Sequence, residues 1–133
     1  MSAEENATTA QQGYAAFGRG DLPAILELLT DDIEWIESGP ADVLPAAGTY
    51  RGKDGVSRFF ATLGEETEIQ KFEPHEFIAQ GDHVVVLIAT EFTVKRTGRK
   101  VSDHLVHVWT FKGGKLAHFE AFRDTAAIVA AYS

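Results

Sequence analysis

The feature that most constrains this chain is a pair of alternating segments joined by two glycines. Residues 98–124 read GRKVSDHLVHVWTFKGGKLAHFEAFRD, and a period of two with consecutive glycines predicts two antiparallel strands around a tight turn. Both faces of the first strand are largely apolar, so we expect both to be covered. The face that mixes ionisable and aromatic groups should line a ligand pocket. That face carries Asp103, Leu105, His107, Trp109 and Phe111, and the opposite face carries His104, Val106, Val108 and Thr110.

The glycine turn leaves two strand registers open. If residues 112–114 form a loop with a bulge, Asp103 lies opposite Arg123. If the two glycines alone form the turn, His107 lies opposite Glu120. We favour the first register because it pairs an acidic with a basic side chain. It also gathers on the His107 face the residues Ala117, Phe119, Ala121 and Arg123.

The composition predicts one globular domain spanning residues 1–133. With 44% hydrophobic residues, the chain is long enough to bury a core and enclose a cavity. A net charge of -8 argues against a nucleic-acid or anionic-membrane partner. The absence of cysteine excludes disulfides and thiolate metal sites. The N-terminus has no basic start or apolar run and no stretch is long enough to span a bilayer, so we expect a cytoplasmic location.

Helical spacing predominates in the first half of the chain. Asp21 should cap a short second helix that Asp31 and Asp32 close, and Asp124 should cap a final one. Gly18 or Gly20 should end the first helix and Gly64 the third. The expected helices are residues 2–17, 21–32, 53–63 and 125–131.

Strands are expected mainly in the second half. Pro74 places its strand at an edge or a bend. A tight hairpin at Thr97-Gly98 should set Ile88 near His107 and Phe92 near Asp103. The expected strands are residues 33–37, 67–79, 84–94 and the two within 98–124. Helices followed by a meander of strands predict an α+β domain with the helices packed in the concave side of the sheet.

The order of these elements resembles a known family. The segments YAAFGRGDLPAILELLTDDIEW, GTYRGKDGVSRFF and DHLVHVWTFKGGKLAHFEAFRD are similar to the SnoaL-like and ketosteroid-isomerase-like branch of the nuclear transport factor 2-like superfamily. The resemblance covers nearly the whole chain and implies a cone-shaped fold with a curved mixed or antiparallel sheet. It also implies a hydrophobic small-molecule ligand, no cofactor, and a homodimer that pairs through the convex sheet face. That face would carry His104, Val106, Val108, His118, Glu120 and Phe122.

Site residues carried over from the family give part of a catalytic site. Glu37 falls where ketosteroid isomerases keep the aspartate that shuttles a proton, and His107 falls where they keep a protonated aspartate that donates to the oxyanion. Gly13 takes the place of the tyrosine of their first helix, one residue before Tyr14, and Phe60 replaces a supporting tyrosine. The resemblance therefore does not imply steroid isomerisation. Because the fold carries isomerases, polyketide cyclases, dehydratases, epoxide hydrolases and non-catalytic binders, it does not specify the reaction.

Glu37 and His107 are the predicted catalytic pair. A carboxyl group among aromatic side chains loses hydration, and this raises its pKa towards neutrality and suits it to remove a proton beside a carbonyl. His107 would hold or protonate the developing enolate oxygen. The alternative is that Glu37 lies at the solvent end of its strand and that His107 is a hydrogen-bonded core histidine. The chain would then be a non-catalytic ligand-binding or dimerisation domain.

The predicted ligand-binding residues also have structural alternatives. Asp103 and Arg123 would clamp a carboxylate or phenolate, or form an ion pair that closes the mouth of the sheet. Of the Asp-Arg-Asp arrangement of limonene-type epoxide hydrolases, only this pair resembles a part. Tyr14 would supply a phenolic donor, unless the backbone satisfies its hydroxyl. The remaining residues would form an apolar wall or simply fill the core, and they are Trp35, Phe60, Phe92, Trp109 and Phe119.

The five histidines do not predict a metal site. His104 and His107 are three residues apart on one strand, so their side chains point to opposite faces. No other histidine has a partner at ligand spacing, and we therefore expect no metal. The leading hypothesis is a cofactor-independent isomerase, cyclase or dehydratase that transfers protons on a hydrophobic carbonyl compound.

Overall fold

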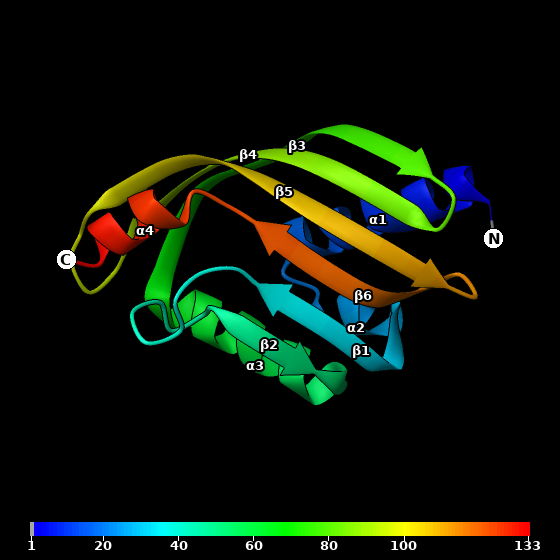
Figure 1. Cartoon of the computed structure of the whole chain (residues 1–133), viewed down its shortest axis with the longest axis horizontal. Helices are drawn as coiled ribbons and strands as arrows, with labels where there is room; N and C mark the ends of the chain where they lie inside the picture. The colour runs from blue at the N-terminus through cyan, green and yellow to red at the C-terminus, as the bar shows by residue number, and fades with distance from the viewer. Residues whose placement is uncertain (1) are drawn as a thin grey trace.

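The computed structural model describes residues 2–133, which form one curved sheet with three helices on one side and a fourth at one end (Figure 1). The six strands lie in the order β2-β1-β6-β5-β4-β3, and only the β1–β6 pair is parallel. The predicted α+β class with a mixed sheet is therefore confirmed. The elements are α1 (Ala3–Arg19), α2 (Leu22–Glu27), β1 (Leu29–Glu37), β2 (Gly48–Arg51), α3 (Gly52–Glu66), β3 (Thr67–Gln80), β4 (His83–Val94), β5 (Lys100–Lys112), β6 (Lys115–Phe122) and α4 (Thr125–Ala131).

The ends of the helices follow local sequence signals. Ser2 and Glu5 form a capping box at the start of α1, and Gly20 ends this helix with a left-handed φ of 69°. Asp21 and Asp124 accept hydrogen bonds from the backbone of the first turns of α2 and α4, so both predicted caps are confirmed. None of the helices within residues 2–133 is long and apolar enough to cross a membrane.

The helices and strands differ from the prediction at three places. Helix α2 ends at Glu27, and Asp31 and Asp32 belong to β1. The strand starts early because the backbone N–H of Leu116 donates to the carbonyl of Leu28, where the parallel pairing of β1 with β6 begins. Helix α3 continues through Gly64 to Glu66. Strand β2, which pairs with β1, is not among the expected strands.

The favoured register of the β5–β6 hairpin, with residues 112–114 as the loop, is wrong, and the alternative two-glycine register holds only beside the turn. Gly113 and Gly114 have φ angles of 59° and 82°, and they form a tight turn in which Lys112 pairs with Lys115. A bulge next to Phe111 then shifts the pairing by one residue, so that His107 pairs with Ala121. Because of this shift, the odd-numbered residues of β6 beyond the bulge return to the His107 face, as the favoured register predicted.

The β4–β5 register also differs from the prediction. Residues 95–99 connect the strands, in place of a tight turn at Thr97-Gly98. As a result, Asp103 pairs with Thr90 and His107 pairs with Val86, each two residues from the predicted partner. Strand β3 lies at the sheet edge, as Pro74 predicted, and its register shifts beside that residue.

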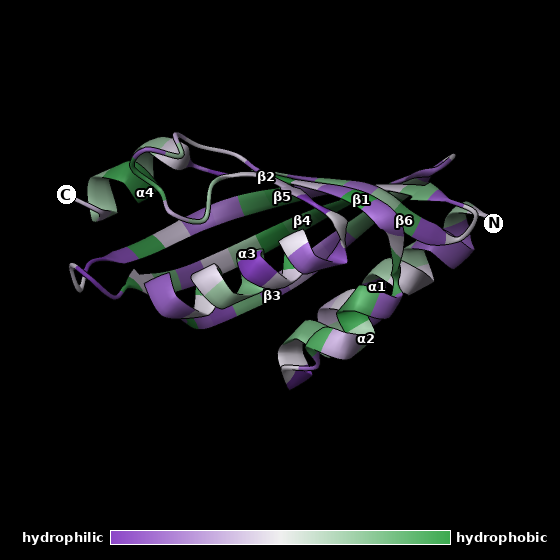
Figure 2. Cartoon of the chain, turned by 90° about the horizontal axis from the view of Figure 1, so that it is seen from below, coloured by the Kyte–Doolittle hydropathy of each residue, from purple (hydrophilic) through white to green (hydrophobic). Residues whose placement is uncertain are grey.

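The concave side of the sheet carries the main core. Helices α1, α2 and α3 all lie on this side, which is turned towards the viewer in Figure 2. Along β4 and β5, buried residues alternate with more exposed ones, so the predicted faces of β5 are confirmed. A smaller apolar cluster joins α4 to the ends of β4 and β5, and it contains Leu44, Phe92, Val94, Val101, Ile128 and Ala131.

Candidate functional site

A cavity lies between the concave face of the sheet and helices α1, α2 and α3. The space not filled by protein atoms is about 830 Å³, and this volume includes open solvent. The lining is mostly apolar and aromatic. All predicted site residues line it except Asp103, which lies behind Arg123. The polar residues of the lining are Tyr14, Glu37, Thr67, Thr90, His107 and Arg123.

Glu37 ends β1 and points into this cavity. Only 8% of the residue is exposed, so it does not lie at the solvent end of its strand. The indole Nε1 of Trp35, two residues earlier on the same face, donates a hydrogen bond of 2.8 Å to Glu37 Oε2. Burial raises the pKa of Glu37 to about 7, against the opposing effects of the nearby Arg123 charge and the Trp35 hydrogen bond. Near neutral pH the carboxyl group therefore exists in both protonation states.

His107 belongs to a hydrogen-bonded chain that begins in α1. Trp109 Nε1 donates to Tyr14 Oη at 2.8 Å, and Tyr14 Oη lies 2.7 Å from His107 Nδ1. Burial, with a smaller effect of Arg123, lowers the pKa of His107 to about 3, so its imidazole is neutral at pH 7. The hydroxyl of Tyr14 is thus satisfied by side chains, and its predicted satisfaction by the backbone is wrong.

The hydrogen bonds from Trp109 to Tyr14 and from Tyr14 to His107 fix which ring nitrogen of His107 carries the hydrogen. A tryptophan N–H can only donate, so Tyr14 accepts from Trp109. The phenolic proton of Tyr14 has no other acceptor within residues 2–133, so it is donated to His107 Nδ1. Burial raises the pKa of Tyr14, so the phenol keeps that proton. The imidazole hydrogen is therefore on Nε2. No acceptor within residues 2–133 bonds to Nε2, and His107 lines the cavity, so the Nε2–H group is free to donate to a ligand.

Glu37 and His107 lie on either side of Ala121. Both residues pair with Ala121, one across the β1–β6 ladder and the other across the β5–β6 ladder. With neighbouring strands about 4.8 Å apart, their Cα atoms are about 10 Å apart. Ala121 is fully buried and contributes only a methyl group between them. The register thus leaves space for a small group between a carboxylate and an imidazole donor.

Aromatic rings form the wall beside this space. Trp35 stacks on Phe119 with a centroid distance of 3.8 Å, and Phe119 meets the edge of His107 at 4.5 Å. Phe60 packs edge-to-face against Trp35 at 5.7 Å. These rings both fill the core and line the cavity, so the two predicted alternatives are combined. Gly13 makes room for this packing, because a Cβ there would lie 2.7 Å from Trp109 Cη2.

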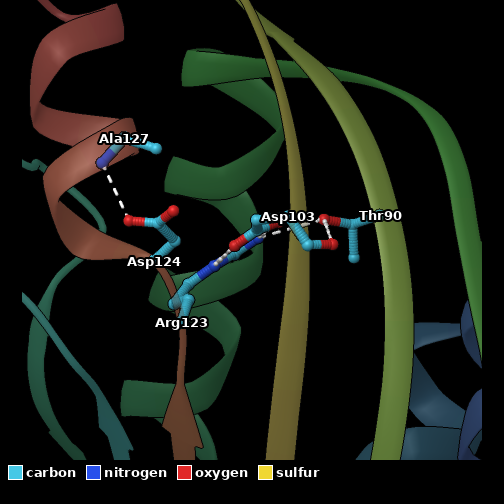
Figure 3. A network of polar contacts seen from close by, with 5 residues as sticks. All are labelled: Thr90, Asp103, Arg123, Asp124 and Ala127. Atoms are coloured by element: carbon cyan, nitrogen blue, oxygen red, sulfur yellow. Dashed lines mark hydrogen bonds and ion pairs between the residues drawn. The ribbon is translucent and has the colours of Figure 1, made fainter.

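Arg123 and Asp103 form an ion pair at one end of the cavity (Figure 3). Their shortest distance is 3.1 Å, and the Asp103 side chain is fully buried. Thr90, which pairs with Asp103 across β4 and β5, donates its hydroxyl proton to the Asp103 carboxylate. The sequence analysis missed Thr90, because the predicted register set Phe92 beside Asp103. The ion pair forms although Arg123 is not the strand partner of Asp103, since a long arginine side chain reaches back across the sheet.

His104 and His107 point to opposite faces of the sheet, as their spacing predicted. His104 is exposed on the convex face, and His107 is buried on the concave face. Within the part of the chain that the structure describes, no three histidine or acidic side chains are arranged to hold a metal ion.

Sequence and structure comparisons place this geometry in a family. A sequence profile of the SnoaL-like domain matches residues 10–119. The chain belongs to the SnoaL-like family. This SnoaL-like protein is 35% identical to an NTF2-like protein from Burkholderia xenovorans LB400, over 100% of this chain and 99% of the other, with a TM-score of 0.91. The predicted resemblance to the nuclear transport factor 2-like superfamily is therefore confirmed.

Two further structures extend the comparison. This SnoaL-like protein is 31% identical to TerC, which was co-crystallized with polyporic acid, over 96% of this chain and 98% of TerC, with a TM-score of 0.86. A protein from Catenulispora acidiphila with a ketosteroid isomerase-like fold, in complex with trimethylamine, is 14% identical over 93% of this chain and 91% of its own, with a TM-score of 0.75. The latter likeness concerns the fold alone. No curated protein matches this SnoaL-like protein in sequence.

Proposed function

We propose that this protein binds a hydrophobic carbonyl compound and catalyses proton transfer at the carbon beside the carbonyl, without a cofactor. The observation that carries the proposal is the placement of Glu37 and His107 on either side of Ala121 in one apolar cavity. Glu37, with a pKa of about 7, is a base that is only partly ionised at neutral pH. His107 offers a fixed hydrogen-bond donor and stays neutral.

The chemistry proceeds through an enolate. The Glu37 carboxylate removes the proton beside the carbonyl, and the C–H electron pair moves towards the carbonyl so that its oxygen becomes negative. His107 Nε2–H donates a hydrogen bond to this oxygen, a contribution whose loss typically costs about 3 kcal/mol of barrier stabilisation. Return of the proton from Glu37 to another carbon gives isomerisation. Attack of the carbanion on a second carbonyl, with the proton passing to the new alkoxide, gives cyclisation. Loss of the hydroxyl on the next carbon as water, with the proton from Glu37, gives dehydration.

Exchange of the acidic protons of 2-tetralone in D₂O, followed by NMR, tests this proposal. The wild-type protein should accelerate exchange above the buffer rate, and Glu37→Gln should return it to that rate. Glu91→Gln is the matched control, because Glu91 is exposed on the face of β4 that points away from the cavity. This variant should catalyse exchange at the wild-type rate. Exchange by Glu37→Gln at the wild-type rate would exclude Glu37 as the base.

A non-catalytic ligand-binding protein is the second candidate. The co-crystallization of TerC with polyporic acid supports a binding role for the cavity, and polyporic acid is a suitable first ligand to test here. Under this alternative, wild type and Glu37→Gln bind ligand with similar affinity and neither catalyses exchange. We propose a cytoplasmic location under either function, from the composition.

We further propose a homodimer that pairs through the convex sheet face. The central part of this face is apolar along β4 and β5, where Val85, Leu87, Val106 and Val108 are only partly buried. Phe122 on the same face is 46% exposed. A second copy of this sheet would cover these side chains.

A further inference from the structure

The guanidinium of Arg123 keeps hydrogen-bond donors free beside the cavity. Its Nε donates to Asp103 Oδ2 at 3.3 Å, and its Nη2 donates to Asp103 Oδ1 at 3.1 Å and lies 3.5 Å from Thr90 Oγ1. A guanidinium has five N–H groups, and within residues 2–133 no acceptor bonds to the two on Nη1. Arg123 lines the cavity, so these donors are available to a ligand.

The same contacts hold the guanidinium in one orientation. Asp103 binds two of its nitrogens, and Thr90 in turn donates to the Asp103 carboxylate (Figure 3). The Arg123 guanidinium carbon lies 5.2 Å from the centre of the Phe92 ring. Only 15% of the Arg123 side chain is exposed. A buried, fixed guanidinium suits two-point recognition of an anionic oxygen pair, because little rotamer freedom remains to be lost on binding.

Arg123 also lies next to the proposed catalytic groups. Its charge lowers the pKa of both Glu37 and His107. Arg123 and Glu37 together line a second hollow, which lies under α4 and residues 38–47 and adjoins the main cavity. A ligand group bound to Arg123 would therefore lie at the junction of the two hollows, close to the Glu37 carboxyl.

We propose that Arg123 binds an anionic oxygen of the ligand, either a carboxylate or an ionised enol, so that the compound bound at this site is a hydrophobic acid. This inference rests on the proposed function, because it specifies the ligand of the same cavity. A neutral ketone of the same shape would leave the Nη1 donors without a partner in a largely apolar pocket.

An anion at Arg123 changes the protonation of Glu37. The charged and titratable groups around Glu37 are Arg123, Asp103 and His107 from the sheet, Tyr14 from α1 and Tyr50 from β2, and Arg58 from α3 acts on Tyr50. A second negative charge beside Arg123 opposes the Glu37 carboxylate and raises its pKa. Since this pKa is about 7 in the free protein, binding should take up about half a proton at pH 7 and up to about one proton near pH 8.

Two matched ligand pairs test the inference by isothermal titration calorimetry. 2-Naphthoate is compared with neutral 2-acetonaphthone, and 2-hydroxy-1,4-naphthoquinone, which is ionised at pH 8, is compared with 2-methoxy-1,4-naphthoquinone. Wild type should bind the anion of at least one pair about ten- to a hundredfold more tightly than its neutral partner, with proton uptake measured in two buffers of different ionisation enthalpy. The pair that shows the preference identifies the carboxylate or the enolate as the group recognised.

Four variants complete the design. Arg123→Gln should abolish the preference, and the double variant Asp103→Asn with Arg123→Gln should do the same without leaving a buried aspartate unpaired. Glu37→Gln should keep the preference and lose the proton uptake. Arg99→Gln, at an exposed position outside the cavity, should bind as wild type does.

The failures of the two proposals are distinguishable. Equal affinity within both pairs, or a preference that survives in the double variant, overturns the role of Arg123 and leaves proton transfer on a neutral ketone in place. Anion preference without proton uptake likewise overturns the inferred coupling to Glu37. If none of the four compounds binds, both the ligand pocket and this inference are overturned.

Discussion

Replacing Glu37 by glutamine should stabilise the protein at alkaline pH much more than at acidic pH. The pKa of this buried carboxyl is about 7, compared with 4.5 for an unperturbed glutamate. Between these values the folded state holds a proton that the unfolded state has released. The contribution of Glu37 to the free energy of unfolding is therefore fully present below pH 4.5 and is lost as the pH rises through about 7.

The size of the effect follows from the same pKa difference. With a pKa of about 7, ionisation of Glu37 should lower the free energy of unfolding by about 2.5 kcal/mol between about pH 5 and pH 8.5. Glutamine cannot ionise but still accepts a hydrogen bond from Trp35, so Glu37→Gln should lack this loss. The pKa of His107 is lowered by burial and destabilises the folded state in acid, but this affects both proteins equally.

Urea unfolding at the two pH values measures the difference. The difference in the free energy of unfolding, Glu37→Gln minus wild type, should be about 2.5 kcal/mol larger at the higher pH than at the lower. The m-value should not change. Glu91→Gln, at an exposed position, should show no such dependence. An offset between Glu37→Gln and wild type that is the same at both pH values would refute the argument that burial controls this carboxyl.

Three further predictions address other parts of the structure. Tyr14→Phe removes the hydroxyl that joins Trp109 to His107, so it should destabilise the fold by about 1–3 kcal/mol, and ¹⁵N NMR of the imidazole should show that Nε2 is no longer the only protonated nitrogen. Wild-type ¹⁵N shifts in this variant would contradict the assigned hydrogen-bond chain. Gly13→Ala places a Cβ 2.7 Å from Trp109 Cη2, and overpacking should lower the free energy of unfolding by about 1–3 kcal/mol, measured by urea unfolding. Gly18→Ala is the control, because the space at its Cβ is open, and this variant should not be destabilised. Phe122→Glu puts a charge on the exposed apolar face and should convert a dimer into a folded monomer, measured by light scattering coupled to size-exclusion chromatography; an unchanged mass would contradict pairing through this face.

The sequence was sufficient to predict which face each residue of β5 occupies. Alternation across residues 103–111 put His107 and Trp109 on the same face, and the structure confirms that both line the cavity. Side-chain direction depends only on the period of the strand. The prediction of which residues face the cavity held although the registers of β5 with β4 and β6 were wrong. Beyond the bulge each predicted partner was wrong by two residues, and a shift of two residues leaves a side chain on the same face.

The contacts between distant segments were not predictable in the same way. The hydrogen bonds of Tyr14 to His107 and Trp109 join residues 93 and 95 positions apart, and they depend on where α1 packs against the sheet. Strand β2 forms because β1 offers it a free edge, and its four residues are too few to show a strand pattern in the sequence. The pairing of Thr90 with Asp103 required the true length of the β4–β5 connection.

The bulge in the β5–β6 hairpin decides which changes of chain length the site tolerates. Ala117 is the extra residue, lying between Leu116, which pairs with Phe111, and His118, which pairs with Thr110. Its deletion would only remove the bulge and would leave the pairs beyond it in place. Deletion of Glu120, beyond the bulge, would instead rotate the end of β6 by half a period, so that Phe122 entered the cavity and Arg123 pointed to the outer surface. In a collection of random mutants, single-codon deletions at Glu120 should therefore abolish ligand binding in chains that still form the sheet, and deletions of Ala117 should not.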